Sequence, residues 1–183
     1  QMVKDGRADF HSGLYKTPER ETFLSFSVPV FPVQDSLAFK SNREPMMLAE
    51  LSGYRVGVIA GSGEETELLE KYPEIIRIPY EGYRELVTGL RDGEVMAVYD
   101  LGVSLQRIIE DLGLQGEIQV SREPTPVRNL FAGVSKKDAF RLKSINSGFS
   151  QITEQEIRNI EARWVSNPDL RQFSGLARRM LLT

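Results

Sequence analysis

The chain has 183 residues, 40% of them hydrophobic and 27% charged, and its 23 basic and 26 acidic side chains give a net charge of −3. This length fits one domain or two small lobes, and the composition is that of an ordinary globular protein. The acidic balance argues against a general nucleic-acid binder. The absence of cysteine excludes disulfides, thiolate metal sites and cysteine nucleophiles. The chain also holds no continuous apolar run of the length that a membrane-spanning helix needs.

Short apolar runs rich in β-forming residues alternate with helical patterns along the chain. We expect strands at 8–11, 35–40, 55–60, 75–79, 95–99, 117–120 and 129–135. We expect helices at 64–72, 81–91, 101–112, 138–151 and 154–165, the last beginning with a capping box at Thr153–Glu156. This alternation predicts an α/β architecture with largely parallel sheets.

The first residues resemble the end of a helix rather than the start of a protein. Gly6 follows Gln1–Asp5 as a helix stop, and a strand comes next. The residues before this strand carry no signal-peptide pattern. We therefore expect an upstream strand and helix to have been removed or to be supplied by another segment.

Two features predict two lobes. The Asp-Gly turn before the strand at 8–11 recurs before the strand at 95–99, although Asp-Gly is also a common turn on its own. Extended, proline-containing stretches at 27–45 and 123–134 would form two crossings between lobes. We expect lobe 1 to comprise 1–42 and 130–168, lobe 2 to comprise 43–129, and a connector tail to occupy 169–183.

Arg20 is a candidate anion-binding residue. Thr17 and Pro18 suit the N-cap and first position of a helix, so Arg20 would lie in its first turn, where a cation opposes the helix dipole. That placement makes sense if the guanidinium and free backbone N–H groups together hold a carboxylate. A surface arginine paired with Glu19 or Glu21 is an equally good interpretation.

Ser62 and Gly63 join the clearest strand to the next helix. Ser62 and Glu65 form a capping-box pattern, which is a structural explanation. The glycines would also let an anionic group approach the start of the helix. The Gly-Lys-Ser/Thr ending of a nucleotide P-loop is missing.

Asp100 follows a predicted parallel strand and precedes a helix. A carboxylate at this end of a strand can bind a ligand cation, or it can cap the helix. Together with Arg20 and Ser62, it would suit a zwitterion with a carboxylate at one end and an ammonium at the other. His11 is the single histidine, and we expect it to have a structural polar role near its strand end.

The pattern resembles the type 2 periplasmic solute-binding proteins specific for polar amino acids. The residues that carry the resemblance are Gly6–Asp9, Thr17–Arg20, Phe26–Pro29, Leu51–Val58 with Gly61-Ser62, and Gly93–Asp100. The resemblance implies a two-lobed Venus-flytrap fold that closes on a ligand, here without the first strand–helix–strand portion of lobe 1.

The resemblance also implies the ligand contacts. The arginine for the α-carboxylate falls on Arg20, and the strand-end backbone and hydroxyl site falls on Ser12, Gly13 and Leu14. The helix-start donors fall on Ser62 and Gly63, and the acid for the ammonium falls on Asp100. In many members small hydroxyl residues stand at the positions of Gly13 and Tyr15, and a threonine stands at that of Gly63.

The ending from Ile152 to Trp164 resembles the sensor branch of the family. We therefore expect an extracytoplasmic, periplasmic sensor domain of a membrane-tethered signalling protein that binds an amino acid or a similar small ligand. No cofactor, metal, nucleic acid or catalytic residue is expected, and a dimer is possible. The alternatives are a substrate-binding subunit of an amino-acid ABC transporter, a dehydratase-like enzyme on the same scaffold, and a purely structural interaction module.

Overall fold

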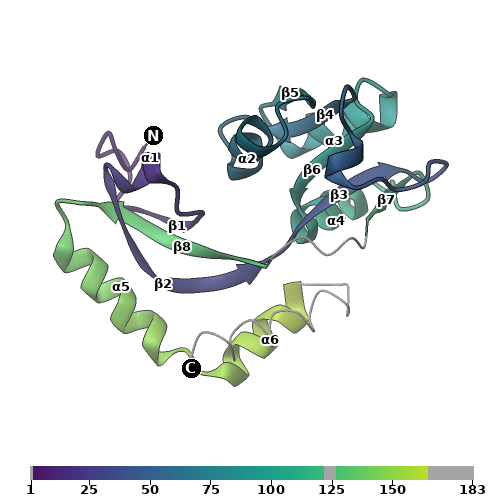
Figure 1. Cartoon of the computed structure of the whole chain (residues 1–183). Coiled ribbons are helices and arrows are strands. Elements are labelled where there is room, and N and C mark those ends of the chain that lie inside the picture. The colour runs from purple at the N-terminus through teal and green to yellow at the C-terminus, as the bar shows by residue number, and fades with distance from the viewer. Residues whose placement is uncertain (1, 122–126, 165–183) are drawn as a thin grey trace. The chain divides into compact units, whose positions relative to one another are not determined.

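The computed structural model describes residues 2–121 and 127–164, and the contacts between residues divide the chain into two units. Unit 1 comprises Gln1–Val33 and Val127–Thr183, and unit 2 comprises Gln34–Pro126. The expected connector tail at 169–183, the last residues expected for lobe 1 (165–168) and residues 123–126 of the expected second crossing lie outside the described residues. Figure 1 labels the helices and strands of both units.

Unit 1 is built on a three-stranded sheet in the order β1-β8-β2. β1 spans Phe10–Leu14, β2 spans Leu24–Val33 and β8 spans Arg128–Ser135. Both pairings are antiparallel, so the expectation of largely parallel sheets is wrong for this unit. The reason is that β8 runs in the opposite direction between β1 and β2.

β2 occupies part of the stretch that was expected only to be extended. Its register with β8 shifts around Pro29, which has no N–H to donate. The Ser27 hydroxyl compensates within the bulge, since it accepts a 2.9 Å hydrogen bond from the N–H of Ala132. The side-chain oxygen of Asn146 accepts from the N–H of Val28 at 2.9 Å and so ties α5 to the same bulge.

The helices of unit 1 are α1 (Pro18–Glu21), α5 (Ala139–Gln151) and α6 (Glu154–Trp164). α5 packs along β2, as Figure 1 shows. The capping box predicted before α6 is confirmed, because the Thr153 hydroxyl accepts from Glu156 N at 3.2 Å and the Glu156 carboxylate accepts from Thr153 N at 2.8 Å.

Unit 2 has a five-stranded sheet in the order β5-β4-β6-β3-β7. The strands are β3 (Asp35–Lys40), β4 (Arg55–Ile59), β5 (Ile76–Tyr80), β6 (Ala97–Leu101) and β7 (Ile118–Val120). β4 pairs in parallel with β5 and β6, as the strand–helix alternation predicts, and β3 is antiparallel to β6 and β7.

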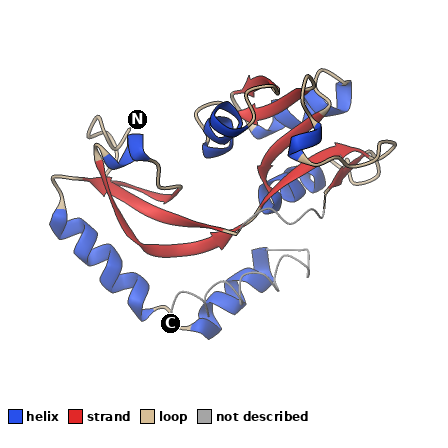
Figure 2. Cartoon of the chain, in the orientation of Figure 1, coloured by secondary structure: helices blue, strands red, loops and turns tan. Residues whose placement is uncertain are grey.

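Helices cover both faces of this sheet (Figure 2). They are α2 (Gly63–Lys71), α3 (Tyr83–Asp92) and α4 (Gly102–Asp111), with a short 3-10 helix at Leu48–Glu50. Successive side chains of a strand point to opposite faces, so Val98 packs with α3 and α4 while Tyr99 packs on the α2 side. Each fully buried leucine or valine in these two cores contributes about 1.5–3 kcal/mol through removal from water.

The boundary between the units differs from the expected lobe boundary. Residues 34–42, expected in lobe 1, belong to unit 2, because β3 pairs with β6 and β7. Residues 127–129, expected in lobe 2, belong to unit 1, because β8 begins at Arg128 and pairs with β2. Both Asp-Gly glycines have positive φ angles, 71° at Gly6 and 84° at Gly93, but only Gly93 ends a helix, because residues 2–6 form turns and not the helix end that was expected there.

Candidate functional site

The candidate residues of unit 1 lie at the carboxyl end of β1 and in the turn that follows. β1 pairs with β8 through Phe10, His11 and Leu14, and the register is interrupted between His11 and Leu14, at Ser12 and Gly13. The interruption leaves the N–H of Gly13 to donate to Nδ1 of His11 at 3.2 Å. Ser12 is exposed, whereas Gly13 and Leu14 are half-buried.

His11 therefore has the structural hydrogen bond that its position suggested. Partial burial of the ring lowers its pKa, and the positive charge of Arg20 lowers it further. Both effects favour the neutral imidazole, which can accept the hydrogen bond from Gly13.

Arg20 is held close to β1 by the backbone. Its Nη1 donates a 3.0 Å hydrogen bond to the carbonyl oxygen of Tyr15, and the guanidinium is half-buried. Thr17 caps α1 as predicted, since its hydroxyl accepts from the N–H of Arg20 at 3.2 Å. α1 is a single turn of four residues in which Pro18 has no N–H and the N–H of Arg20 donates to Thr17, so we keep the guanidinium as the candidate anion-binding group.

Tyr15 connects Arg20 to a second arginine that sequence reasoning missed. The guanidinium carbon of Arg128 lies 3.9 Å from the centre of the Tyr15 ring, a cation–π contact. Tyr15 is 8% exposed, so its ring and carbonyl form a buried support for two guanidinium groups. Nothing in the sequence links Tyr15 to Arg128, because they meet only through the pairing of β1 with β8.

The candidate residues of unit 2 lie at one edge of its sheet. β4 and β6 are parallel, so the turn after β4 and the end of β6 are at the same edge. Ser62 is the N-cap of α2, with its hydroxyl accepting from Glu65 N at 3.0 Å, and the buried Gly63 is the first helical residue. The Glu65 carboxylate accepts from Gly61 N at 2.7 Å, a variant of the expected capping box.

Asp100 is buried, with 2% of its surface exposed. Its Oδ1 accepts two hydrogen bonds of 2.7 Å, one from the hydroxyl of Tyr83 and one from the N–H of Leu101. Burial and the nearby charge of Asp100 raise the pKa of Tyr83 well above its usual value, so Tyr83 keeps its proton and remains a donor. The carboxylate of Asp100 is thus held in one orientation by α3 and by its own strand.

Two further carboxyl groups lie with Asp100, and sequence reasoning missed both. Glu64, in the first turn of α2, is 3% exposed, and Asp35, at the start of β3, is 1% exposed. Burial, then the charges of Asp100 and Asp35, raise the pKa of Glu64 to about 8. Glu64 therefore carries a proton at neutral pH, which removes one negative charge from beside Asp100.

Tyr99 extends this acidic cluster (Asp35, Glu64 and Asp100). Its hydroxyl lies 3.3 Å from Oδ2 of Asp35 and 3.1 Å from Oε2 of Glu67.

Within the part of the chain that the structure describes, no group of three or more His, Cys, Asp or Glu side chains has the arrangement needed to hold a metal ion. No helix of residues 2–121 and 127–164 is long and apolar enough to cross a membrane.

Each unit thus contains one set of candidate ligand-binding residues. Unit 1 offers a guanidinium beside a strand bulge, and unit 2 offers a helix start beside an oriented carboxylate. These are the chemical groups that bind a carboxylate and an ammonium.

Comparison with known proteins defines the class. Residues 1–167 match the model of the bacterial extracellular solute-binding proteins, family 3, and the chain belongs to this family. Its fold is the Venus-flytrap fold of periplasmic binding proteins.

Relatives include both transport and sensor proteins. A putative ABC transporter arginine-binding protein of Escherichia coli K12 is 28% identical over 88 residues, which cover 48% of this chain and 36% of that protein. The virulence sensor protein BvgS of Bordetella bronchiseptica is 21% identical over 166 residues, 88% of this chain. The match covers only 13% of BvgS, so the chain corresponds to a small part of that relative.

Solved structures share the fold at low identity. The periplasmic VFT2 domain of Bordetella pertussis BvgS has a TM-score of 0.73 at 20% identity, over 89% of this chain and 70% of that one. Holo ArgBP from T. maritima has a TM-score of 0.75 at 20% identity, over 90% of this chain and 73% of that one. The solute receptor for L-cysteine of Neisseria gonorrhoeae has a TM-score of 0.79 at 17% identity, over 92% of this chain and 72% of that one.

Proposed function

We propose that this chain binds an α-amino acid or a similar small zwitterionic or anionic molecule, as the extracytoplasmic, periplasmic sensor domain of a membrane-tethered signalling protein. The observation that carries the sensor assignment is the match to BvgS, which extends over 88% of this chain, whereas the match to the arginine-binding protein covers 48%. The relatives are solute-binding and sensor proteins, which supports binding rather than catalysis.

In this proposal Arg20 binds the ligand carboxylate. A guanidinium can bind a carboxylate through two parallel hydrogen bonds, and Arg20 is half-buried, where such a pair is less screened by water than at the surface. Its bond to the Tyr15 carbonyl supports this role, because it fixes one side of the guanidinium before a ligand arrives. Ser12, Gly13 and Leu14 would contribute backbone and hydroxyl contacts at the strand end.

Asp100 is proposed to accept the ligand ammonium, with Ser62 and Gly63 as donors at the start of α2. The two hydrogen bonds to Oδ1 of Asp100 support a preorganised carboxylate. The proton on Glu64 supports the same role, because a neutral Glu64 adds no negative charge beside Asp100.

A transport role is the second candidate. The arginine-binding relative of Escherichia coli favours a substrate-binding subunit of an amino-acid ABC transporter. The gene that encodes this chain distinguishes the two roles. A reading frame with a membrane-spanning segment and a signalling module after this domain supports the sensor, and one that ends shortly after Thr183 beside permease genes supports the transporter.

A thermal-shift screen of the purified chain against the twenty amino acids tests ligand binding. A ligand present at about 100 times its Kd stabilises the folded state by about 2.7 kcal/mol and so raises Tm. We expect a small group of amino acids to raise Tm at millimolar concentration. No shift with any of them would contradict an amino-acid ligand, and no shift with any small molecule would favour a structural interaction module.

A further inference from the structure

Unit 2 contains a second candidate site at the sheet edge opposite to Ser62 and Asp100. A cavity of about 350 Å³ opens there, where β4 and β6 begin and β3 ends. β3 is antiparallel to β6, so the last residue of β3 and the residues before β4 and β6 meet at this edge. The lining residues used below are called the basic pocket: Lys40, Arg43, Tyr54, Arg55, Gly93 and Glu94.

The basic pocket carries positive charge in a chain whose net charge is −3. Lys40, Arg43 and Arg55 line it against a single acidic side chain, Glu94. None of the three cations forms an ion pair with another residue of the described part of the chain. The carboxylate of Glu94 instead accepts a 3.0 Å hydrogen bond from the hydroxyl of Tyr80.

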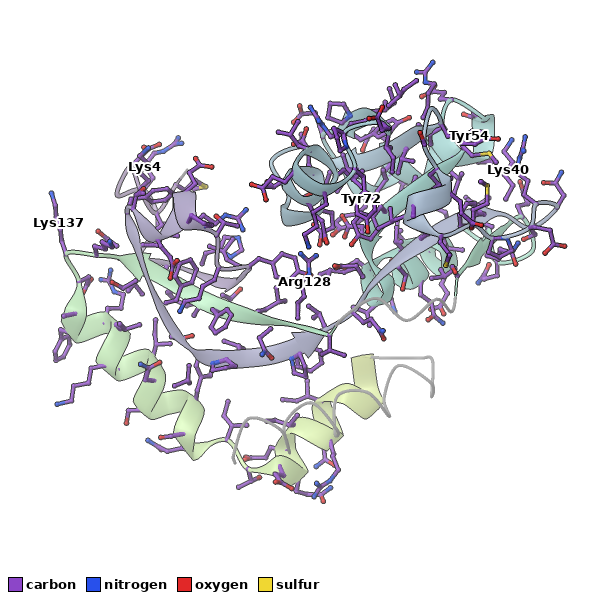
Figure 3. All side chains as sticks on the ribbon, in the orientation of Figure 1. Lys4, Lys40, Tyr54, Tyr72, Arg128 and Lys137 are labelled. Atoms are coloured by element: carbon purple, nitrogen blue, oxygen red, sulfur yellow. The ribbon has the colours of Figure 1, made fainter. Side chains whose placement is uncertain are left out.

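Local backbone conformation brings these groups together. Gly93 ends α3 with a φ of 84°, and a Cβ at this position would lie 3.3 Å from Nζ of Lys40. Glycine therefore permits both the left-handed turn and the close approach of the ammonium group. Tyr54 is 44% exposed, and Figure 3 shows Tyr54 and Lys40 at the same end of unit 2.

We propose that the basic pocket binds a phosphate-bearing anion. Two guanidinium groups and one ammonium match a doubly charged phosphate better than a singly charged carboxylate, and arginine binds phosphate oxygens in a bidentate manner. The same chemistry is offered by a soluble phosphorylated small molecule and by the headgroup of an anionic phospholipid. This proposal does not depend on the amino-acid ligand, because the pocket uses none of the residues assigned to that ligand.

Titration of the whole chain with inorganic pyrophosphate by calorimetry at low ionic strength tests the pocket. We expect saturable binding that weakens as salt is added. Arg43→Gln and Arg55→Gln should each weaken it about 10-fold, through loss of a charge-assisted pair. Arg107→Gln is the matched control, since Arg107 is an exposed arginine of the same unit, on α4, paired with Asp111.

Glu94→Gln supplies a variant with the opposite expected effect. It removes the acidic charge from the pocket and keeps an acceptor for Tyr80, so pyrophosphate should bind about 2- to 5-fold more tightly. A gain of affinity cannot arise from misfolding. Binding that the three pocket variants leave unchanged, or no saturable binding of pyrophosphate or vesicles, would overturn the proposal.

Vesicle sedimentation distinguishes the two sources of phosphate. The probe is a vesicle of phosphatidylcholine with phosphatidylglycerol, compared with phosphatidylcholine alone. Sedimentation with the anionic vesicles that Arg43→Gln weakens would assign the pocket to a lipid headgroup. Pyrophosphate binding without sedimentation would assign it to a soluble phosphorylated molecule.

Discussion

The hydroxyl of Tyr83 donates a 2.7 Å hydrogen bond to Oδ1 of Asp100. The bond joins α3 to the end of β6, and it brings a donor to a carboxylate that is only 2% exposed. A buried carboxylate needs such donors, because it has lost its hydration.

Tyr83→Phe should therefore lower the free energy of unfolding by about 1.5–3 kcal/mol, the usual effect of losing a hydrogen bond to a charged group. Urea unfolding followed by circular dichroism measures it. Tyr72→Phe is the control, because Tyr72 packs on the core of the α2 side and no hydrogen bond involves its hydroxyl within the described residues. Equal losses in the two variants would argue against a special role for the Tyr83–Asp100 bond.

The protonated Glu64 predicts a pH dependence of stability. The pKa of Glu64 is about 8 in the folded chain and 4.5 for an unperturbed glutamate. Between these values the folded state holds a proton that the unfolded state has released, so the contribution of Glu64 falls by about 1.4 kcal/mol per pH unit as pH rises. This loss should be complete just above pH 8.

Glu64→Gln should remove this component, because a carboxamide stays neutral and can still donate to Asp35. Urea unfolding at several pH values from 5 to 9 should show a smaller decline in the variant than in the original chain. Glu70→Gln is a matched control on the exposed face of the same helix and should retain the decline. Parallel pH curves for all three proteins would show that Glu64 is ionised in the folded state.

Two glycine substitutions should change the free energy of unfolding in opposite directions. At Gly57 in β4 a Cβ would lie 2.9 Å from Leu86 Cδ1, 3.0 Å from the Tyr80 ring and 3.1 Å from Val98 Cγ1. Gly57→Ala should thus destabilise unit 2 by about 1–3 kcal/mol through overpacking. At Gly148, in α5, no heavy atom of the described residues outside the neighbouring backbone lies within 4 Å of the same position, so Gly148→Ala should stabilise unit 1 by about 0.5–1 kcal/mol.

Calorimetric unfolding of both variants measures this contrast. Because the substitutions lie in different units, a separate transition for each unit would show each effect directly. Stabilisation by Gly57→Ala would mean that the core of β4, α3 and β6 has room that the structure does not show.

Local signals in the sequence were sufficient for most elements. The alternation of strands and helices predicted the α/β unit around β4, and the capping residues Thr17, Ser62 and Thr153 were found because a cap needs only a few neighbouring residues. The antiparallel sheet of unit 1 was not predicted, because β8 joins β1 and β2 from more than 90 residues away along the sequence.

The candidate site residues also differ in whether the sequence around them carries a local signal. Asp100 was a candidate because it follows the strand predicted at 95–99, which is a local pattern; the structure extends β6 to Leu101, so Asp100 is its penultimate residue. Glu64 was interpreted only as part of a helix, and its high pKa depends on two carboxyl groups that are brought near by folding. The only local sign of its role is its position directly after Ser62-Gly63.

The central claim, that Arg20 binds the carboxylate of an amino acid, is tested most directly by calorimetry with the amino acid that gives the largest thermal shift. Arg20→Ala should weaken binding by about 1.5–3 kcal/mol, roughly 10- to 150-fold, because a charge-assisted pair is lost. Arg7→Ala, which removes an exposed arginine of the same unit, should bind as the original chain does. Unchanged affinity in Arg20→Ala would contradict the account.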